Sequence, residues 1–276
     1  MLDARMFLPI KAALFAWLIA CAAWIGGTGA VWAQEAPKEA RYGDDNISVE
    51  LFADGLPVEG EDWMLALRFT PSSEEWHGYW SNPGDAGQGM QLQLDLPEGW
   101  AMGEPLYPVP QRLVQELPDR ALMNHIYKGS FTVLVPVTVG ASADNAIRPP
   151  VTGHVEYLAC TDVVCVPQDA VLQELQGGDF ARWRAEIAPL IDAQANFAFA
   201  DTTLRLAIPL PAGVALPEPH IFIGNERLVQ YAAAQDFRRA ADMLSVEIPL
   251  SEWVEQGEHN AEVTGILSFG DGAGVR

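Results

Sequence analysis

The stretch VTGHVEYLACTDVVCVPQDAVLQEL, residues 151–175, contains two strand-like runs separated by a short connection. Apolar and polar residues alternate from 151 to 160 and again from 165 to 175, which is the period of a strand with one buried face. Cys160 ends the first run and Cys165 begins the second. The stretch therefore predicts two strands with a cysteine on each side of their connection.

Similar short runs fill the chain on the N-terminal side of this stretch. They are separated by Pro, Gly, Asn and Asp, the residues that favour turns. The runs lie at 47–55, 63–71, 89–97 and 129–140. This spacing predicts an all-β fold, with an antiparallel, immunoglobulin-like β-sandwich over residues 44–176.

A helical pattern interrupts the strands over residues 177–196. Asp179 is a candidate helix cap, and the helix is expected to run from 180 to 195. Its apolar face would contain Phe180, Trp183, Ile187, Leu190 and Ile191. Pro189 should bend or interrupt the helix, because proline lacks the backbone N–H of a helix interior. We interpret this segment as a helical connector to a second, smaller β domain over 197–276, with strand-like runs at 203–211, 220–229, 243–251 and 261–269.

The first 33 residues have the pattern of a secretory signal peptide. Arg5 and Lys11 precede an apolar run, and small residues lead to Ala33 as the cleavage position. A lipoprotein is the alternative, since Leu18-Ile19-Ala20-Cys21 resembles a lipidation box. Simple cleavage leaves Cys160 and Cys165 as the two cysteines of an exported, periplasmic chain. In an oxidising compartment they are expected to pair with each other.

Three interpretations of the cysteine pair stay open at this point: a structural staple, a metal site and a redox pair. A short loop removes little entropy from the unfolded chain, so the staple would be weak. A metal site would need further ligands, and His154 is the one nearby in sequence. The acids Glu156 and Asp162 flank the pair, and no Lys or Arg occurs between Arg148 and Arg182. We therefore expect thiols that are not low-pKa nucleophiles in their own right, and a pair that is suited to being attacked and to being activated by a docked partner.

The overall charge narrows the possible ligands. The formal net charge of −21 argues against nucleic acid and anionic lipid. The sequence contains no G-x-S-x-G elbow, no H-E-x-x-H and no phosphate-binding glycine loop. These patterns disfavour a hydrolase, and we expect neither a metal nor a cofactor.

Two further segments have both a structural and a functional interpretation. WHGYW, residues 76–80, either plugs the core or forms an aromatic wall in which His77 or Tyr79 faces a reactive site. The proline-rich segment 105–110 forms either an edge strand or a rigid loop that could cover another part of the molecule. A non-catalytic β-sandwich that binds a protein or glycan through its aromatic loop, with an inert disulfide, is the alternative function.

Five motifs together resemble the N-terminal domain of DsbD, and still more the same region of its ScsB-type relatives. They are WHGYWSNPGDAG (76–87), LDLPEGW (94–100), YPVPQRL (107–113), YKGSFTVLVPVTV (127–139) and EYLACTDVVCVPQDAVL (156–172). The weaker pattern at 195–270 resembles the second extracytoplasmic domain of ScsB-type proteins. The DsbD proteins have one more residue between their cysteines, so a tighter loop is expected here.

The resemblance implies a periplasmic thiol–disulfide exchange protein, part of a protein-disulfide reductase, that relays electrons between thioredoxin-fold partners. Cys160 and Cys165 would be the redox pair, with Cys165 facing partners and Cys160 resolving the mixed disulfide. Tyr79, Trp80, Tyr107 and Pro167 are the candidate cap or partner-binding residues. The larger family members continue into a membrane electron conduit, which another chain would supply here. Two alternatives stay open, a separate subunit and part of a longer protein.

Overall fold

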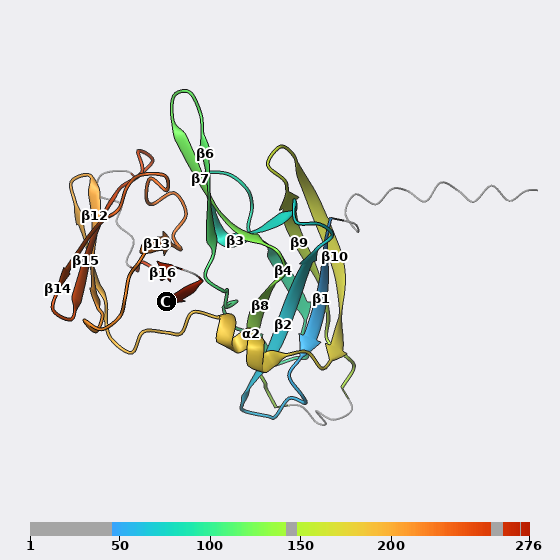
Figure 1. The fold of residues 1–276 in the computed structure, drawn as a ribbon. Coiled ribbons are helices and arrows are strands. Elements are labelled where there is room, and N and C mark those ends of the chain that lie inside the picture. Colours follow the sequence, from blue (N-terminus) through green and yellow to red (C-terminus); the bar gives the residue numbers. More distant parts are fainter. Residues whose placement is uncertain (1–45, 142–147, 255–261, 271) are drawn as a thin grey trace, which may run out of the picture. The chain divides into compact units, whose positions relative to one another are not determined.

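In the computed structural model, residues 46–176 form two antiparallel sheets, which are joined by one parallel pair of strands (Figure 1). The structure describes residues 46–141, 148–254, 262–270 and 272–276. The predicted signal peptide and the alternative lipidation of Cys21 lie outside these residues. The parallel contact pairs Leu51 of β1 (Ile47–Ala53) with Glu174 of β10 (Cys165–Gln176).

Each sheet has a simple antiparallel order around this contact. In the first sheet the strand order is β1, β2 (Asp62–Pro71), β8 (Phe131–Thr138) and β5 (Ala101–Met102). In the second sheet the strand order is β10, β9 (Thr152–Cys160), β3 (His77–Gly84), β7 (Ala121–Lys128) and β6 (Gln111–Glu116). β4 (Gln91–Asp95) also pairs with β9. The predicted strands at 47–55, 63–71, 151–160 and 165–175 are therefore present within one or two residues.

The main core lies between the inner faces of the two sheets. Leu67 of β2 and Val133 of β8 meet Val155 of β9 in one buried cluster, and the rings of Phe69 and Phe131 stack 4.6 Å apart. Alternate residues of β9 point into this core, which puts the others, including Cys160, on the outer face of the second sheet. The predicted immunoglobulin-like sandwich is confirmed.

The connecting helix is shorter than its sequence pattern predicts. α2 (Phe180–Glu186) begins at Asp179, whose side chain accepts a hydrogen bond from the backbone N–H of Arg182 at 3.1 Å. Phe180 and Trp183 are buried, as expected, in a cluster with Ala66 and Leu134. The chain becomes extended at Ile187, two residues before Pro189, so the expected continuation to 195 is wrong.

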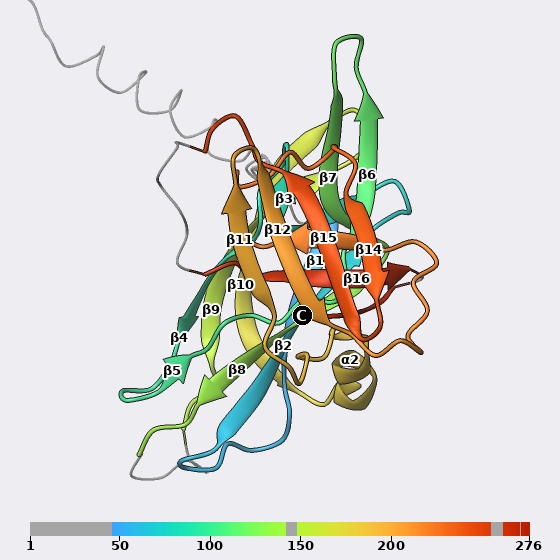
Figure 2. The same ribbon diagram turned by 90° about the vertical axis from the view of Figure 1, so that its left-hand side faces the viewer.

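Residues 196–276 form two small sheets with their own apolar cluster. Figure 2 shows the four-stranded sheet, in the order β11 (Asn196–Ala200), β12 (Thr203–Pro209), β15 (Met243–Pro249) and β14 (Asp236–Ala240). The three-stranded sheet contains β13 (His220–Ile223), β16 (Gly265–Gly270) and β17 (Ala273–Val275).

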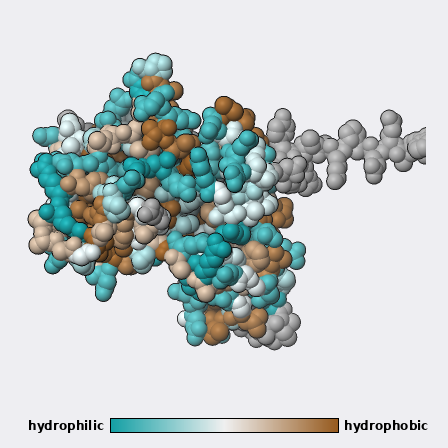
Figure 3. Space-filling model, in the orientation of Figure 1, coloured by the Kyte–Doolittle hydropathy of each residue, from teal (hydrophilic) through white to brown (hydrophobic). Residues whose placement is uncertain are grey.

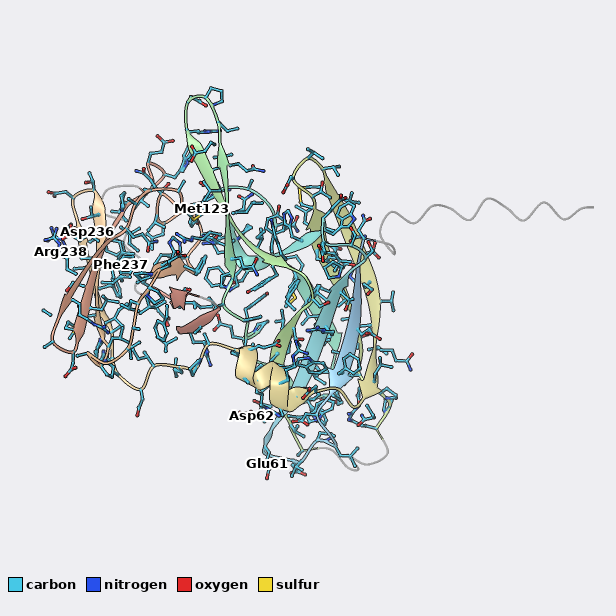
Figure 4. The ribbon with its side chains drawn as sticks, in the orientation of Figure 1. Glu61, Asp62, Met123, Asp236, Phe237 and Arg238 are labelled. Carbon is cyan, nitrogen blue, oxygen red and sulfur yellow. A yellow bond between two sulfur atoms is a disulfide. The ribbon has the colours of Figure 1, made fainter. Side chains whose placement is uncertain are left out.

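Side chains of the first region reach this second cluster. Met123 of β7, labelled in Figure 4, packs with Leu204 and Val246. The buried Asn82 of β3 donates hydrogen bonds from Nδ2 to the carbonyl of Ile223 at 2.7 Å and to Tyr231 Oη at 3.0 Å. The second β region predicted for 197–276 is thus present, while its independence as a domain stays a prediction.

Candidate functional site: the cysteine hairpin

The end of the β9–β10 hairpin holds Cys160 and Cys165 directly opposite each other. Their Cα atoms are 4.1 Å apart and their sulfur atoms form a disulfide. Thr161 closes the loop, because its backbone N–H donates to the carbonyl of Val164 at 2.8 Å and its Oγ1 accepts from the N–H groups of Val163 and Val164. The four-residue connection is therefore an ordered turn across which the disulfide lies.

The two sulfur-bearing residues have very different surroundings. Cys160 is 0 % exposed and packs with Tyr79 and Ile126 in a small apolar cluster on the outer face of the sheet. Cys165 is exposed, and it follows two exposed valines, Val163 at 94 % and Val164 at 48 %. Figure 3 shows hydrophobic surface at this end of the hairpin. An incoming group can therefore approach Cys165 and not Cys160.

Tyr79 lies beside the exposed sulfur. Its hydroxyl oxygen is 3.9 Å from Cys165 Sγ, and burial of the ring raises the pKa of the phenol. The hydroxyl therefore keeps its proton at neutral pH and is able to donate a hydrogen bond to sulfur. A Cβ atom on Gly87, which has φ +107°, would lie 2.2 Å from the Tyr79 ring. The backbone of the β3–β4 connection thus covers the tyrosine, and only glycine allows so close an approach.

A row of four residues crosses the second sheet at the level of the disulfide. The strand registers place Cys165 opposite Cys160, Cys160 opposite His77, and His77 opposite Lys128. Residues directly opposite in neighbouring strands project from the same face. The imidazole of His77 therefore lies between the buried cysteine and a lysine that is 32 residues earlier in the sequence than Cys160.

The electrostatics of this row differ from what the neighbouring sequence predicts. The sequence has no Lys or Arg between Arg148 and Arg182, whereas the strand register brings Lys128 into the same row as the pair. Burial lowers the pKa of His77, Lys128 lowers it further, and Asp162 in the cysteine loop raises it. The sequence predicts that His77 or Tyr79 faces a reactive site. Lys128 lies within the motif at 127–139, but its place beside His77 depends on the pairing of β7 with β3, which the sequence does not show.

Comparison with known families agrees with this arrangement of strands and cysteines. Residues 50–177 match the family model of the N-terminal region of the thiol:disulfide interchange protein DsbD. Residues 50–177 are a DsbD N-terminal domain. The segment contains both cysteines and all the strands that position them, and it is a thiol–disulfide exchange domain by family.

A solved structure supports the fold over a longer part of the chain. The N-terminal periplasmic domain of ScsB from Proteus mirabilis aligns with a TM-score of 0.57 at 13 % identity, covering 83 % of this chain and 90 % of that one. A GH20 exo-β-N-acetylglucosaminidase from Vibrio harveyi aligns with a TM-score of 0.19 at 10 % identity, over 65 % of this chain and 23 % of that one. The search of curated proteins gave no match.

The other predicted cap residues of the DsbD-type domain lie in different places. The Trp80 side chain is buried, with its ring 5.7 Å from that of His125 and 6.1 Å from that of Phe222. Tyr107 is buried in the main core and lines, together with Tyr79, a cavity of about 10 Å³. Among the described residues, both belong to the main core and Cys160 belongs to a separate cluster, so their role as a cap stays a prediction.

Pro167 lies at an open edge of the second sheet. It is exposed and opposite Leu158 of β9, while β1 pairs with β10 only from Glu174 onward. On its other side, the segment 165–173 has no paired strand in the part of the chain that the structure describes. This edge is next to the exposed sulfur, although a role of Pro167 in partner binding stays a prediction.

The described residues contain no group of three or more His, Cys, Asp or Glu side chains arranged to hold a metal ion. Among the same residues, no helix is long and apolar enough to cross a membrane.

Proposed function

We propose that this protein relays electrons between thioredoxin-fold proteins by thiol–disulfide exchange at Cys160 and Cys165. The unequal exposure of the two cysteines carries the proposal. Exchange begins with a thiolate that reaches one sulfur of a disulfide. Exposure of Cys165 and burial of Cys160 support attack at Cys165 alone.

The reaction consists of two exchange steps. A partner thiolate attacks Cys165 Sγ, a mixed disulfide forms, and Cys160 leaves as a thiolate that takes up a proton. The second thiol of the partner then attacks the partner sulfur of the mixed disulfide and releases Cys165. The partner is oxidised and the pair is reduced. The reverse sequence transfers the same two electrons to an oxidised partner, and no cofactor is required.

The surface around Cys165 supports docking of a protein partner. Val163 and Val164 are apolar and exposed beside the sulfur, and no strand of the described residues pairs with the edge of β10 at Pro167. Apolar contacts and strand addition at an edge are common modes of protein recognition. Asp162 and Asp169 add negative charge nearby, which favours a partner with a positive or neutral rim.

The partners and the compartment are part of the proposal. We expect a periplasmic protein whose acceptors are disulfide isomerases, peroxiredoxin-like proteins or thioredoxins of cytochrome c maturation. The donor would be a membrane electron conduit supplied by another chain. The family of residues 50–177 supports thioredoxin-like partners as a class.

The alternative is a binding module with an inert disulfide. It depends on an aromatic loop that faces solvent. His77, Tyr79 and Trp80 are buried, so the segment 76–80 offers little aromatic surface to a ligand. This burial favours the exchange proposal.

Trapping of mixed disulfides tests the proposal. Cys160→Ser leaves the exposed thiol free and should accumulate disulfide-linked complexes with a purified thioredoxin that lacks its own resolving cysteine and carries thionitrobenzoate on the remaining one, because Cys165 attacks that disulfide and the coloured thiolate leaves. Cys165→Ser, the matched control, leaves only the buried thiol and should trap little. Equal trapping by both variants would contradict the proposal that partners attack Cys165 alone. A wild-type disulfide that resists reduction by thioredoxin would instead support the binding module.

A further inference from the structure

His77 is a buried polar residue that the exchange steps described above do not use. Its side chain is 1 % exposed, and neither ring nitrogen has a hydrogen-bond partner among the described residues. Its ring lies 5.5 Å from that of Tyr79, centre to centre, in an edge-on arrangement. A buried polar group without a partner costs about 1–3 kcal/mol. A residue retained at such a cost is a candidate for a role in the chemistry.

The position of His77 relates it to Cys160 more closely than to any other reactive group described. The two residues are directly opposite in β3 and β9, and Cβ atoms of such pairs are about 4.5–5.5 Å apart. On the other side, His77 is directly opposite Lys128 of β7. The charged and titratable groups that face the imidazole are thus Cys160 and Lys128 from the flanking strands, Tyr79 from its own strand and Asp162 from the cysteine loop.

Resolution of a mixed disulfide requires a proton acceptor at this place. In the mixed disulfide, Cys160 is a thiol within an apolar cluster, and such surroundings disfavour the thiolate that must attack. Solvent does not reach Cys160, which is fully buried. Burial and Lys128 lower the pKa of His77, so its imidazole is neutral at neutral pH and has one nitrogen free to accept a proton.

We propose that His77 accepts the proton of Cys160 when Cys160 resolves the mixed disulfide. This inference rests on the proposed exchange at the cysteine pair. The S–H bond of Cys160 breaks as its proton passes to the imidazole, and the sulfur attacks Cys165 Sγ. The Cys160–Cys165 bond forms, the bond between Cys165 and the partner breaks, and the partner leaves as a thiolate. The imidazolium then returns its proton to solvent or to the partner thiolate.

Lys128 affects the two halves of this transfer differently. Its charge favours the thiolate of Cys160 as the proton leaves, whereas it lowers the pKa of His77, which weakens the imidazole as a base and favours return of the proton from the imidazolium. In the opposite direction, when Cys160 is the leaving group, the N–H of the neutral imidazole is a donor for the new thiolate. Lys128 acts through His77 and is a positioning residue in this scheme.

Reaction of the reduced protein with one equivalent of 5,5′-dithiobis(2-nitrobenzoate) tests the inference without a natural partner. Cys165 releases the first coloured thiolate as it forms a mixed disulfide, and attack by Cys160 releases the second. In His77→Gln the second release should slow about a hundredfold or more near pH 7, within the range of general-base catalysis, while the first is unchanged. The deficit should shrink toward pH 9, because a larger fraction of the thiol is then already ionised at equilibrium and needs no base during the attack.

His154→Gln is the matched control. His154 lies on β9 and faces the same side as Cys160, six residues away, where it pairs with Asp169. It should behave as wild type in both phases. An unchanged second phase in His77→Gln at every pH would overturn the inference, and so would equal slowing of both phases, which indicates a structural role.

A measurement on wild-type protein keeps the inference testable if His77→Gln does not fold. The ¹⁵N shifts of the His77 ring should differ between the oxidised and reduced proteins, because reduction places a thiol beside a ring nitrogen. Identical ring shifts in the two states would exclude proton sharing with Cys160. Failure of thioredoxin trapping together with a slow second phase in His77→Gln would refute the relay and leave the role of His77 intact.

Discussion

The hydroxyl oxygen of Tyr79 lies 3.9 Å from Sγ of Cys165, the exposed sulfur of the pair. The ring of Tyr79 is buried under the backbone at Gly87, which holds the hydroxyl in this place. Burial raises the pKa of the phenol. After reduction, a protonated hydroxyl at this place can donate a hydrogen bond to the Cys165 thiolate. The same residue thus shields one side of the disulfide and stabilises its reactive form.

Tyr79→Phe should therefore reduce the reactivity of Cys165. The variant keeps the ring and removes only the donor, so we expect alkylation of Cys165 by iodoacetamide near pH 7 to slow about tenfold to a hundredfold, as loss of one hydrogen bond to a charged group implies. The measurement uses reduced protein in a Cys160→Ser background. Tyr107→Phe is the control, since no contact of Tyr107 with Cys165 is described. Equal rates in the two variants would contradict the role of the Tyr79 hydroxyl.

Gly87→Ala should loosen the cover over Tyr79. Alanine at φ +107° is strained, and its Cβ would overlap the Tyr79 ring. We expect faster oxidation of the reduced pair by small oxidants and a loss of about 1–3 kcal/mol in the free energy of unfolding. Gly99→Ala is the matched control, because Gly99 has φ +81° with nothing within 4 Å of its Cβ position. If both variants oxidise at the same rate, the connection does not protect the pair.

The strands of the sandwich could be predicted because they obey a local rule. Residues 151–175 alternate throughout, and both strands form with Cys160 and Cys165 at their facing ends. The hairpin β6–β7 was missed although it is regular, since QRLVQE and ALMNHIYK are mostly polar or mixed and give no clear period. The predicted helix continued too far because the apolar spacing of Leu190 and Ile191 outweighed the effect of Pro189.

The candidate site could be predicted only in part. The cysteines and Tyr79 carry recognisable motifs, but the neighbours of Cys160 depend on strand pairing over long sequence separations. His77 is opposite Cys160 although 83 residues separate them, and Lys128 joins the same row from a strand that was not predicted. Such a register is set by the packing of both sheets and by the loops, which no local pattern encodes.

The double variant Cys160→Ser/Cys165→Ser should remain folded. The disulfide closes a loop whose ends are five residues apart in sequence, and short loops are at the low end of disulfide stabilisation. We expect a loss of about 0–3 kcal/mol in the free energy of unfolding, measured by urea denaturation. An unfolded double variant at room temperature would mean that the pair is mainly a structural staple.

Acid should destabilise the contact between the β3–β7 pair and the C-terminal sheets. Burial lowers the pKa of His125 to about 4 and that of His220 to about 3, while a hydrogen bond to the carbonyl of Asn82 partly offsets the effect at His125. The rings of both histidines pack against Phe222, and His125 also contacts Tyr231. Each histidine is therefore neutral in the folded protein at a pH where it is charged in the unfolded chain.

The sign of the pH effect follows from this difference in proton binding. Between an unfolded pKa of about 6.5 and the folded values, the unfolded chain binds more protons, so the free energy of unfolding falls as the pH falls. For His125 the loss between pH 7 and pH 4 is on the order of 3 kcal/mol. Urea denaturation at a series of pH values should show this slope in wild type and a shallower one in His125→Gln. A slope unchanged by His125→Gln would show that other groups cause the acid sensitivity.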